Sequence, residues 1–338
     1  MPSKVIGKRL WVALALLVSA LALFLIASTS YNAVVSHRFW AAYVEEGKLV
    51  TVGQARMYIN CSGTGSPALI LESGLGDSSI AWAAIQPALS KNLRVCSYDR
   101  LGVGYSDDAS KPRDAAQISS ELHDLLQNAH IPGPYVLMGH SIGGLYVREF
   151  AMQFPKEVAG LILVDATPPY LEKNPLFAHE VPTAPSWLVR AAFASGIVRL
   201  TGRCSHRFSN PQFDRLEAED QCRMRYKESA AELEGFDGSS AEVTRNPFTA
   251  IVPLLIFSHD PEFQTESLQD RMSQKEWNKL QEQYKLLSQQ SERIIAISST
   301  HYVMVDRPDL VIRMTKLFMA SLNRPEEASL LQHRTKRE

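Results

Sequence analysis

The feature that most constrains the fold of this chain is an alternation of short apolar runs with segments of helical spacing. Such runs fall at residues 68–71, 135–138 and 161–164, and residues 93–98 are a further predicted strand. Runs that are apolar throughout are typical of parallel strands buried on both faces of a sheet. Because strand–helix–strand crossovers are right-handed, the alternation predicts a doubly wound α/β architecture with a mostly parallel sheet.

Prolines interrupt this alternation after Thr167, and it resumes only at Pro253 with another apolar run. The intervening segment has helical rather than strand-like spacing, around residues 187–200 and 210–233. We therefore expect a core formed by two stretches with a helical cap inserted between them, followed by a charged tail. The expected bounds are 45–167 and 250–322 for the core, 168–249 for the cap and 323–338 for the tail.

The N-terminus carries the pattern of a membrane or export segment. Lys4, Lys8 and Arg9 precede an uncharged apolar run over residues 10–27, and about 18 residues is the short end of what spans a bilayer. Basic residues before the run, with none directly after it, predict that the folded part lies on the exported side. Residues 1–30 are therefore interpreted as a signal anchor. A cleaved signal peptide, giving a secreted or periplasmic protein, remains the alternative.

Charge and cysteine content narrow the possible partners. The formal net charge is −1, so no global field attracts nucleic acid and no nucleic-acid partner is expected. The four cysteines lack the spacing of a zinc site. An even number of cysteines in an exported chain permits disulfides, and four buried thiols are the alternative. The oligomeric state stays open. The cysteines are Cys61, Cys96, Cys204 and Cys222.

A serine lies at the turn between one of these runs and the next helix. The motif Gly139-His140-Ser141-Ile142-Gly143 follows the run at 135–138 and precedes helical spacing over 142–154. A serine on a strained strand-to-helix turn has its hydroxyl lifted out of the strand end, and the glycines on either side leave room for neighbouring backbone. The context favours Ser141 as a nucleophile over a bystander serine in a glycine-rich turn.

A serine hydroxyl needs a neighbouring general base near neutral pH. His301 follows the last predicted strand, at residues 293–298, and precedes the last helix. Loops at the carboxyl ends of strands build the sites of open α/β sheets. Among the nine histidines, His301 is therefore the predicted base.

The histidine in turn needs a carboxylate that fixes its tautomer. Asp260 follows the strand at 254–258, and it gives the chain order Ser–Asp–His typical of nucleophile-elbow hydrolases. Asp260 is the predicted acid. Asp165, directly after another apolar strand, and Glu262 remain alternatives.

Acyl transfer also requires backbone N–H groups that stabilise the developing oxyanion. Ile142, the residue after the serine, is one predicted donor. The second is expected from the glycine-flanked Leu75, in the loop after the strand at 68–71.

Together these residues resemble the α/β-hydrolase superfamily, over about residues 48–322. Residues 99–107 (DRLGVGYSD) are similar to that family's D-R-x-G-x-G-x-S motif after the fourth strand. The resemblance implies a sheet of the eight-stranded type and no metal or organic cofactor. It also implies that Asp99 and Arg100 tie together loops near the site.

The family topology places the second and fourth strands side by side. It thereby implies a disulfide between Cys61 and Cys96, since neighbouring strands bring Cβ atoms into range. A second disulfide, Cys204–Cys222, is the matching hypothesis within the cap.

The resemblance implies a serine hydrolase that cleaves a small-molecule carboxylic ester or an amide. An exported aminopeptidase or a C–C hydrolase is the alternative, with the α-amino group of a peptide bound by Glu217, Glu219 or Asp220. A non-catalytic binding module is a third hypothesis. Haloalkane dehalogenases and epoxide hydrolases use Asp where this chain has Ser141. Apolar cap residues expected to set substrate size are Phe177, Trp187, Leu188, Phe193 and Phe208.

Overall fold

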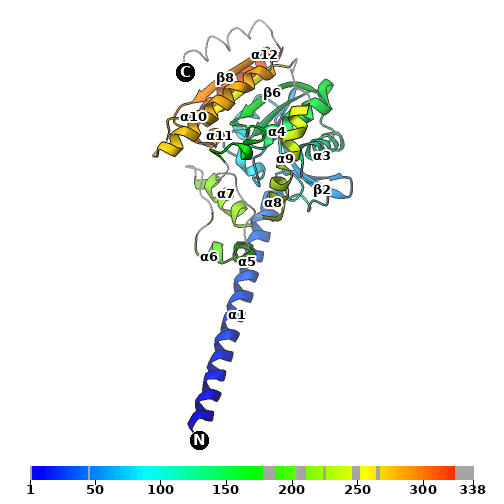
Figure 1. The fold of residues 1–338 in the computed structure, drawn as a ribbon. Coiled ribbons are helices and arrows are strands. Elements are labelled where there is room, and N and C mark those ends of the chain that lie inside the picture. The colour runs from blue at the N-terminus through cyan, green and yellow to red at the C-terminus, as the bar shows by residue number, and fades with distance from the viewer. Residues whose placement is uncertain are drawn as a thin grey trace.

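The computed structural model contains an α/β core, a helical insertion and a long N-terminal helix (Figure 1). It describes residues 2–44, 46–177, 187–202, 204, 211–223, 226–245, 252–263 and 267–323. Residues 324–338 of the expected tail and several stretches of the expected cap, Phe208 among them, lie outside the described residues.

The core is an 8-stranded sheet in the order β1-β2-β4-β3-β5-β6-β7-β8. The first two pairings in this order are antiparallel, and the pairings from β4–β3 through β7–β8 are parallel. The mostly parallel, doubly wound sheet predicted from the apolar runs is confirmed. The strands are β1 Lys48–Val52, β2 Ala55–Ser62, β3 Ala68–Glu72, β4 Val95–Tyr98, β5 Tyr135–His140, β6 Val158–Val164, β7 Leu254–His259 and β8 Ser291–Ala296.

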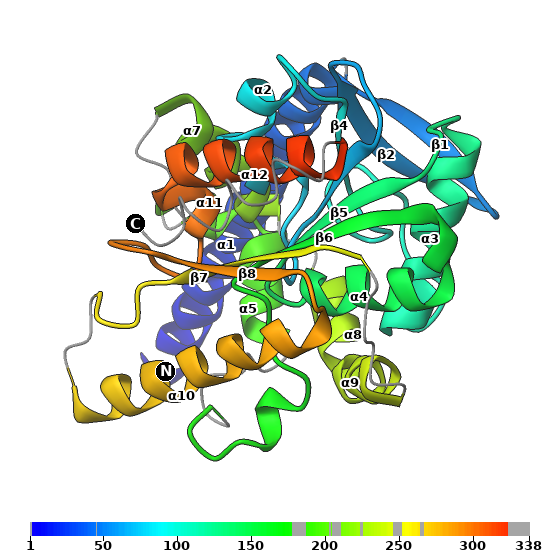
Figure 2. The ribbon, with the colours of Figure 1, turned by 90° about the horizontal axis from the view of Figure 1, so that it is seen from above.

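Helices cover both faces of this sheet, as Figure 2 shows from above. One face packs against η1 Ser79–Trp82, α2 Gln86–Leu89, α11 Val303–Asp306 and α12 Pro308–Asn323. The other face packs against α3 Ala115–Asn128, α4 Gly143–Gln153, η2 Pro155–Glu157, α10 Leu268–Gln283 and η4 Tyr284–Leu287. Every residue of β3, β4, β5 and β7 is buried, because side chains on both faces of these strands meet helices.

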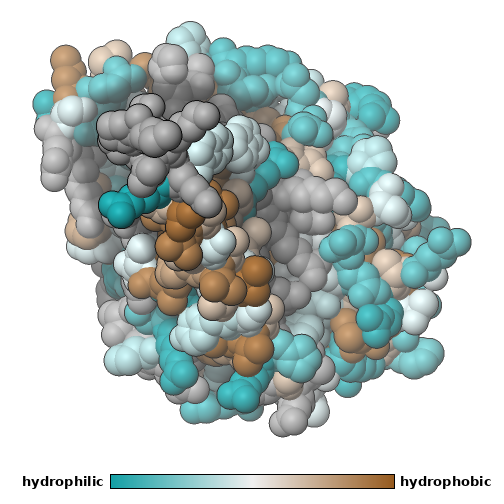
Figure 3. Space-filling view, turned by 90° about the horizontal axis from the view of Figure 1, so that it is seen from below, coloured by the Kyte–Doolittle hydropathy of each residue, from teal (hydrophilic) through white to brown (hydrophobic). Residues whose placement is uncertain are grey.

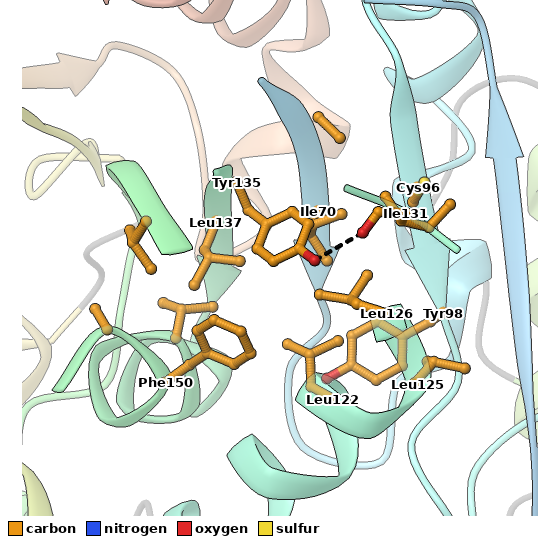
Figure 4. Packing of buried hydrophobic residues seen from close by; sticks show 14 of the residues in the cluster. Ile70, Cys96, Tyr98, Leu122, Leu125, Leu126, Ile131, Tyr135, Leu137 and Phe150 are labelled. Atoms are coloured by element: carbon orange, nitrogen blue, oxygen red, sulfur yellow. Dashed lines mark hydrogen bonds between the residues drawn. The ribbon is translucent and has the colours of Figure 1, made fainter. Parts of the chain in front are cut away.

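The core is closed by apolar side chains that fill the space between the sheet and the helices. Leu122 and Phe150 project from α3 and α4 towards Leu137 on β5 (Figure 4). The Tyr135 hydroxyl, a polar group within this cluster, donates to the Ile131 carbonyl at 2.7 Å, which removes the cost of burying it.

The insertion between β6 and β7 consists of short helices. The helix expected over residues 187–200 is divided at Gly196, whose φ of +75° ends one helix and begins the next. The helix α9 was not expected from the sequence. The described elements are η3 Leu171–Lys173, α5 Trp187–Ala194, α6 Ile197–Leu200, α7 Pro211–Arg223, α8 Tyr226–Glu234 and α9 Phe236–Arg245.

Both expected disulfides are present. Cys61 and Cys96 are directly opposite one another in the β2–β4 ladder, with their Cα atoms 4.1 Å apart. Cys204 and Cys222 are bonded to each other within the insertion. The first bond ties an edge hairpin to the parallel sheet, and the second joins the segment after α6 to α7.

The N-terminal helix α1 runs without interruption over Pro2–Val44 and projects away from the core (Figure 1). Its stretch Arg9–Phe39 is long and apolar enough to cross a membrane, with a mean hydropathy of 2.8 and none of the most apolar window buried. The helix therefore extends well beyond the apolar run at residues 10–27. Residues 31–44, which follow this run, are helical as well.

Candidate active site

Ser141 occupies a strained turn between β5 and α4. Its φ is +52°, a left-handed conformation that L side chains rarely adopt. Glycines make the turn possible: a Cβ on Gly139 would lie 2.6 Å from the Gly143 carbonyl oxygen, and a Cβ on Gly143 would lie 2.6 Å from the Ser73 carbonyl oxygen. The glycines of the motif are therefore required by close backbone approach.

The Ser141 hydroxyl lines a pocket that His301 also lines. Its hydrogen bond in this structure is to the Thr167 hydroxyl, with 3.1 Å between the two oxygens. Thr167 also donates its backbone N–H to the Ser141 carbonyl at 2.9 Å. Sequence reasoning missed Thr167, although it comes only two residues after one of the candidate acids, Asp165.

Asp165, rather than Asp260, is the carboxylate that contacts His301. The Asp165 Oδ2 atom lies 2.6 Å from His301 Nδ1 and 2.7 Å from His259 Nδ1. Its Oδ1 atom accepts from the Trp277 indole N–H at 3.0 Å and from the His259 backbone N–H at 3.2 Å. Asp165 is fully buried with a φ of +44° at the end of β6. Four donors thus fix the position of one buried carboxylate.

These contacts control the charge of the acid. Burial alone would raise the pKa of Asp165, but hydrogen bonds from His259 and His301 outweigh it and hold the pKa well below the usual range. Burial lowers the pKa of His259, and the hydrogen bond to Asp165 more than compensates, so this pKa is raised. The carboxylate therefore stays ionised and stabilises positive charge on the His259 imidazole.

Asp260 has a different place from the one the chain order suggested. Its Oδ2 atom accepts from the Ser298 backbone N–H at 2.9 Å, and its Oδ1 atom accepts from the Glu262 N–H at 3.0 Å. Successive side chains of a strand point to opposite faces, and His259, one residue earlier, already faces Asp165. Asp260 therefore points away and ties the loop after β7 to the loop that leads to His301. Glu262 is exposed.

Leu75 and Ile142, the two predicted oxyanion donors, line the same pocket as Ser141. In a trans peptide the C=O and the following N–H point in opposite directions. The Ser141 carbonyl is bound by the N–H groups of Gly144 and Thr167, each at 2.9 Å, which turns the Ile142 N–H the other way. The Gly74 carbonyl accepts from Arg100 Nη2 at 2.7 Å, which orients the Leu75 N–H in the same manner.

Arg100 also connects this loop to the insertion. It is 2% exposed and forms ion pairs with Glu72 at 2.6 Å and with Glu232 of α8 at 2.8 Å. It donates a further hydrogen bond to the Ser73 carbonyl at 2.8 Å. Two carboxylates and two carbonyls thus satisfy the hydrogen-bond donors of this buried guanidinium. The loop-tying role that the resemblance implied for Arg100 is consistent with these contacts.

Asp99 ties the neighbouring loops. Its carboxylate accepts from the backbone N–H groups of Ser79 at 2.7 Å and Tyr105 at 2.8 Å. Gly104 (φ +52°) passes so close that a Cβ there would lie 2.2 Å from an Asp99 oxygen. Position 104 therefore requires a glycine, because the Asp99 carboxylate lies where a Cβ would be.

The pocket has a volume of about 380 Å³ and apolar walls. Trp277 and Phe177 form one wall, with their rings 5.9 Å apart, and Leu233 and Phe236 come from α8 and α9. Of the apolar cap residues expected to set substrate size, Phe177 lines this pocket, whereas Trp187 and Leu188 are exposed elsewhere.

The His140 side chain is buried beneath the pocket. Its Nε2 atom lies 3.0 Å from the His301 carbonyl oxygen. Burial, together with the nearby His301, lowers the pKa of His140 to about 3. His140 is therefore neutral at physiological pH and supports the loop that carries His301.

The carboxylates considered for binding an α-amino group do not line the pocket. Asp220 is buried with its carboxylate 2.6 Å from the Ser78 hydroxyl, and burial raises its pKa to about 8. Glu217 is also buried, and Glu219 pairs with Arg199. Asp77, which sequence reasoning did not single out, is the carboxylate on the pocket wall, where it accepts from the Tyr302 hydroxyl at 3.1 Å.

Asp165, His259 and His301 are also the group of described residues with the spacing of metal ligands, their donor atoms lying within 4.8 Å of one another. Their nitrogen and oxygen atoms are directed at each other in hydrogen bonds. Sequence reasoning missed the participation of His259 and Trp277. The position of His259 next to Asp260 was the one signal in the sequence that could have indicated its role. Trp277 could not be found in this way, because it comes from a helix distant in the chain.

Comparison with known proteins gives relatives in sequence and in fold. A protein of Schizosaccharomyces pombe is 42% identical over 82 residues, which is 24% of this chain and 15% of that protein. An esterase from Thermogutta terrifontis superposes with a TM-score of 0.58 at 18% identity, over 82% of this chain and 98% of that one. The epoxide hydrolase CorEH gives a TM-score of 0.60 at 17% identity, over 82% and 99%.

The curated relatives are matched only in part, since the chain covers 15%, 20% and 33% of three of them. The solved structures, at below 20% identity, show the fold. The family model described as "alpha/beta hydrolase fold" matches residues 67–286, which is more than half of the sequence and contains β3 through β7. This chain is a member of the alpha/beta hydrolase family.

Proposed function

We propose that this hydrolase cleaves a carboxylic ester through an acyl-enzyme, with Ser141 as nucleophile, His301 as general base and Asp165 as the orienting acid. The observation that carries the proposal is the 2.6 Å contact between the buried Asp165 and His301 Nδ1, in a pocket that also contains Ser141 on its strained turn. A carboxylate at Nδ1 leaves Nε2 as the basic nitrogen, which is what activation of a serine requires.

The reaction divides into two acyl transfers. His301 Nε2 removes the Ser141 proton as the hydroxyl oxygen attacks the ester carbonyl, and it returns that proton to the leaving alcohol when the C–O bond breaks. A water molecule, deprotonated by the same nitrogen, then attacks the acyl-enzyme and releases the acid. The N–H groups of Leu75 and Ile142 stabilise the oxyanion in both steps.

The pocket favours a neutral, apolar substrate. Apart from its histidines, the described residues that line it include one carboxylate, Asp77, and no lysine or arginine. An anionic acyl group would have no cation to pair with there, whereas aromatic and aliphatic walls favour an alkyl or aryl group. Esters fit this site better than peptides with a free amino terminus, because none of Glu217, Glu219 and Asp220 reaches it.

We also infer that α1 anchors the enzyme in a membrane with the catalytic domain on the exported side. Lys4, Lys8 and Arg9 precede the apolar span, as in proteins whose N-terminus stays in the cytoplasm. The two disulfides favour an oxidising compartment for the domain.

The test is covalent labelling by a fluorophosphonate probe, followed by turnover of p-nitrophenyl esters of increasing acyl length. We expect the wild-type chain to be labelled at Ser141 and to hydrolyse these esters. Ser141→Ala should lose both properties, whereas Ser321→Ala, on α12, should keep them. A folded wild-type protein that neither takes the label nor turns over an ester would contradict the proposal.

A further inference from the structure

The helix α5 carries an apolar surface that the described part of the chain leaves uncovered. None of its residues is buried. Trp187 is 74% exposed, Leu188 is 60% exposed, and Leu200 on the adjacent α6 is 50% exposed. A solvent-facing helix of a soluble domain normally buries one face and presents a polar one. This helix presents a tryptophan and two aliphatic residues in succession, at Trp187, Leu188 and Val189.

The same helical pair is attached to α1 by hydrogen bonds. Ser28 donates to the Ser195 carbonyl, and Asn32 donates to the Phe193 carbonyl at 3.4 Å. Arg199 of α6 donates to Asn32 Oδ1 at 2.8 Å.

Two further features strengthen this attachment. Arg199 also donates to the Ser36 hydroxyl at 3.2 Å. A Cβ on Gly196 would lie 2.7 Å from Asn32 Cβ, so the backbones approach as closely as a glycine permits. The attachment residues Ser28, Asn32 and Ser36 recur every four residues and therefore share one face of α1.

This attachment lies at the end of the apolar run of α1. Residues 10–27 form about 27 Å of helix, close to the thickness of the hydrocarbon core of a bilayer. Ser28, which follows directly, therefore falls at the boundary between hydrocarbon and headgroups. Its partner Ser195 joins α5 to α6, so the exposed residues of α5 lie at that boundary too. Figure 3, viewed from the side on which α1 projects, shows hydrophobic side chains gathered near the middle of this face.

We propose that α5 and α6 form a second membrane contact, in which Trp187, Leu188 and Leu200 enter the interface of the bilayer that α1 spans. The inference rests on the proposed anchoring by α1. Tryptophan is enriched at the headgroup level, where its ring is apolar and its N–H remains hydrated. A lipid surface, rather than a second copy of the chain, is the partner, because the contact to α1 places this patch in the membrane plane. The insertion is thereby held against the bilayer at two points, α1 and the α5–α6 pair.

The experiment uses the full chain in phosphatidylcholine nanodiscs with a photoreactive residue at one position. Leu188→p-benzoylphenylalanine is the test variant. Leu17→p-benzoylphenylalanine, in the apolar run of α1, is the positive control. Leu286→p-benzoylphenylalanine, on an exposed leucine of η4 in the core, is the matched negative control. After irradiation, lipid adducts are measured by mass spectrometry.

We expect phospholipid adducts at positions 17 and 188, with a yield at 188 several-fold above that at 286. Adducts at 17 with none above the control at 188 would overturn the membrane contact and leave the anchor intact. A lack of adducts at 17 would overturn both the anchor and the contact that rests on it, and esterase assays on the same samples would report on catalysis separately. A protein–protein crosslink at 188 in place of a lipid adduct would assign the patch to a second copy.

Discussion

At the scale of single residues, the site is built around one buried carboxylate. Asp165 accepts hydrogen bonds from two histidine rings, one indole and one backbone N–H. A carboxylate bound by several donors is held ionised and in one orientation. His259 shares this carboxylate with His301 and fixes it from the β7 side. His259 is therefore expected to act as a positioning residue.

The pairing of His259 with Asp165 predicts a pH-dependent stability. Because the pKa of His259 is raised above the usual histidine value of about 6.5 in the folded state, its stabilising contribution is fully present below that value. The contribution is lost as the pH rises through the folded-state pKa. We expect the wild type to exceed His259→Gln in stability by about 1.5–3 kcal/mol near pH 5.5, with a smaller difference at alkaline pH. Denaturant unfolding of both proteins over a pH series measures this, and a difference that grows with pH would be evidence against the pairing.

Sequence reasoning predicted two of the three residues of the proposed triad. Ser141 was recognisable because its turn needs glycines at fixed positions, and His301 because it follows the last strand. For the acid, chain order favoured Asp260, whereas the carboxylate that contacts His301 is Asp165; both follow buried strands at the same sheet edge. Which of the two aspartates contacts His301 depends on the face to which each side chain points, and on the position of His259 next to Asp260. Chain order fixes neither of these.

At the scale of elements, Arg100 joins the loop after β3 to α8. Its guanidinium pairs with Glu72 on β3 and Glu232 on α8, and it holds the carbonyls of Ser73 and Gly74. The loop that presents the Leu75 N–H is therefore positioned by a charge network shared with the insertion. Movement of α8 would be transmitted to the oxyanion donor through this side chain.

Replacement of Arg100 is predicted to affect catalysis separately from stability. Arg100→Lys keeps the charge but loses the fork that binds both carbonyls, and we expect kcat for a p-nitrophenyl ester to fall about tenfold or more. Arg113→Lys is the matched control, because Arg113 is also buried and pairs with Glu121 at 2.7 Å, but its guanidinium does not bind the carbonyls of Ser73 and Gly74. Both variants should unfold at a lower temperature. An unchanged kcat in a folded Arg100→Lys protein would contradict the positioning role of Arg100.

The elements of the core were largely predictable, and those of the insertion were less so. Strands buried on both faces leave long apolar runs, which explains why β3, β5, β6 and β7 were found within a few residues of their ends. Helices of the insertion have mixed patterns, because one side faces the pocket or α1 while the other faces solvent. For this reason α9 was not predicted, and the single helix predicted over residues 187–200 is two helices, α5 and α6, in the structure.

At the scale of the whole molecule, the disulfides and the α1 helix support the proposed anchoring of the enzyme in a membrane. Cys61–Cys96 ties the antiparallel edge to the parallel sheet, and Cys204–Cys222 staples the insertion. Family topology allowed the first bond to be anticipated because it makes β2 and β4 neighbours. The contact between α1 and the insertion was not predictable, since it joins residues more than 160 positions apart in the chain.

The disulfides give a direct prediction for the isolated protein. Under denaturing but non-reducing conditions an alkylating reagent should add no mass, and after reduction it should modify all four cysteines. Intact-protein mass spectrometry separates the two states. Alkylation of any cysteine before reduction would show that the corresponding bond is absent, and would weaken the assignment of the domain to an oxidising compartment.

The identity of the acid is the central claim, and two carboxylate variants test it most directly. Asp165→Asn and Asp260→Asn should be compared for kcat/KM on one p-nitrophenyl ester and for the rate of fluorophosphonate labelling. We expect Asp165→Asn to lose about 10⁴-fold in turnover, as when a triad histidine is left in the wrong tautomer. Asp260→Asn should keep turnover within about tenfold of wild type while unfolding at a lower temperature. A folded Asp260→Asn protein that is inactive, beside an active Asp165→Asn protein, would contradict the account.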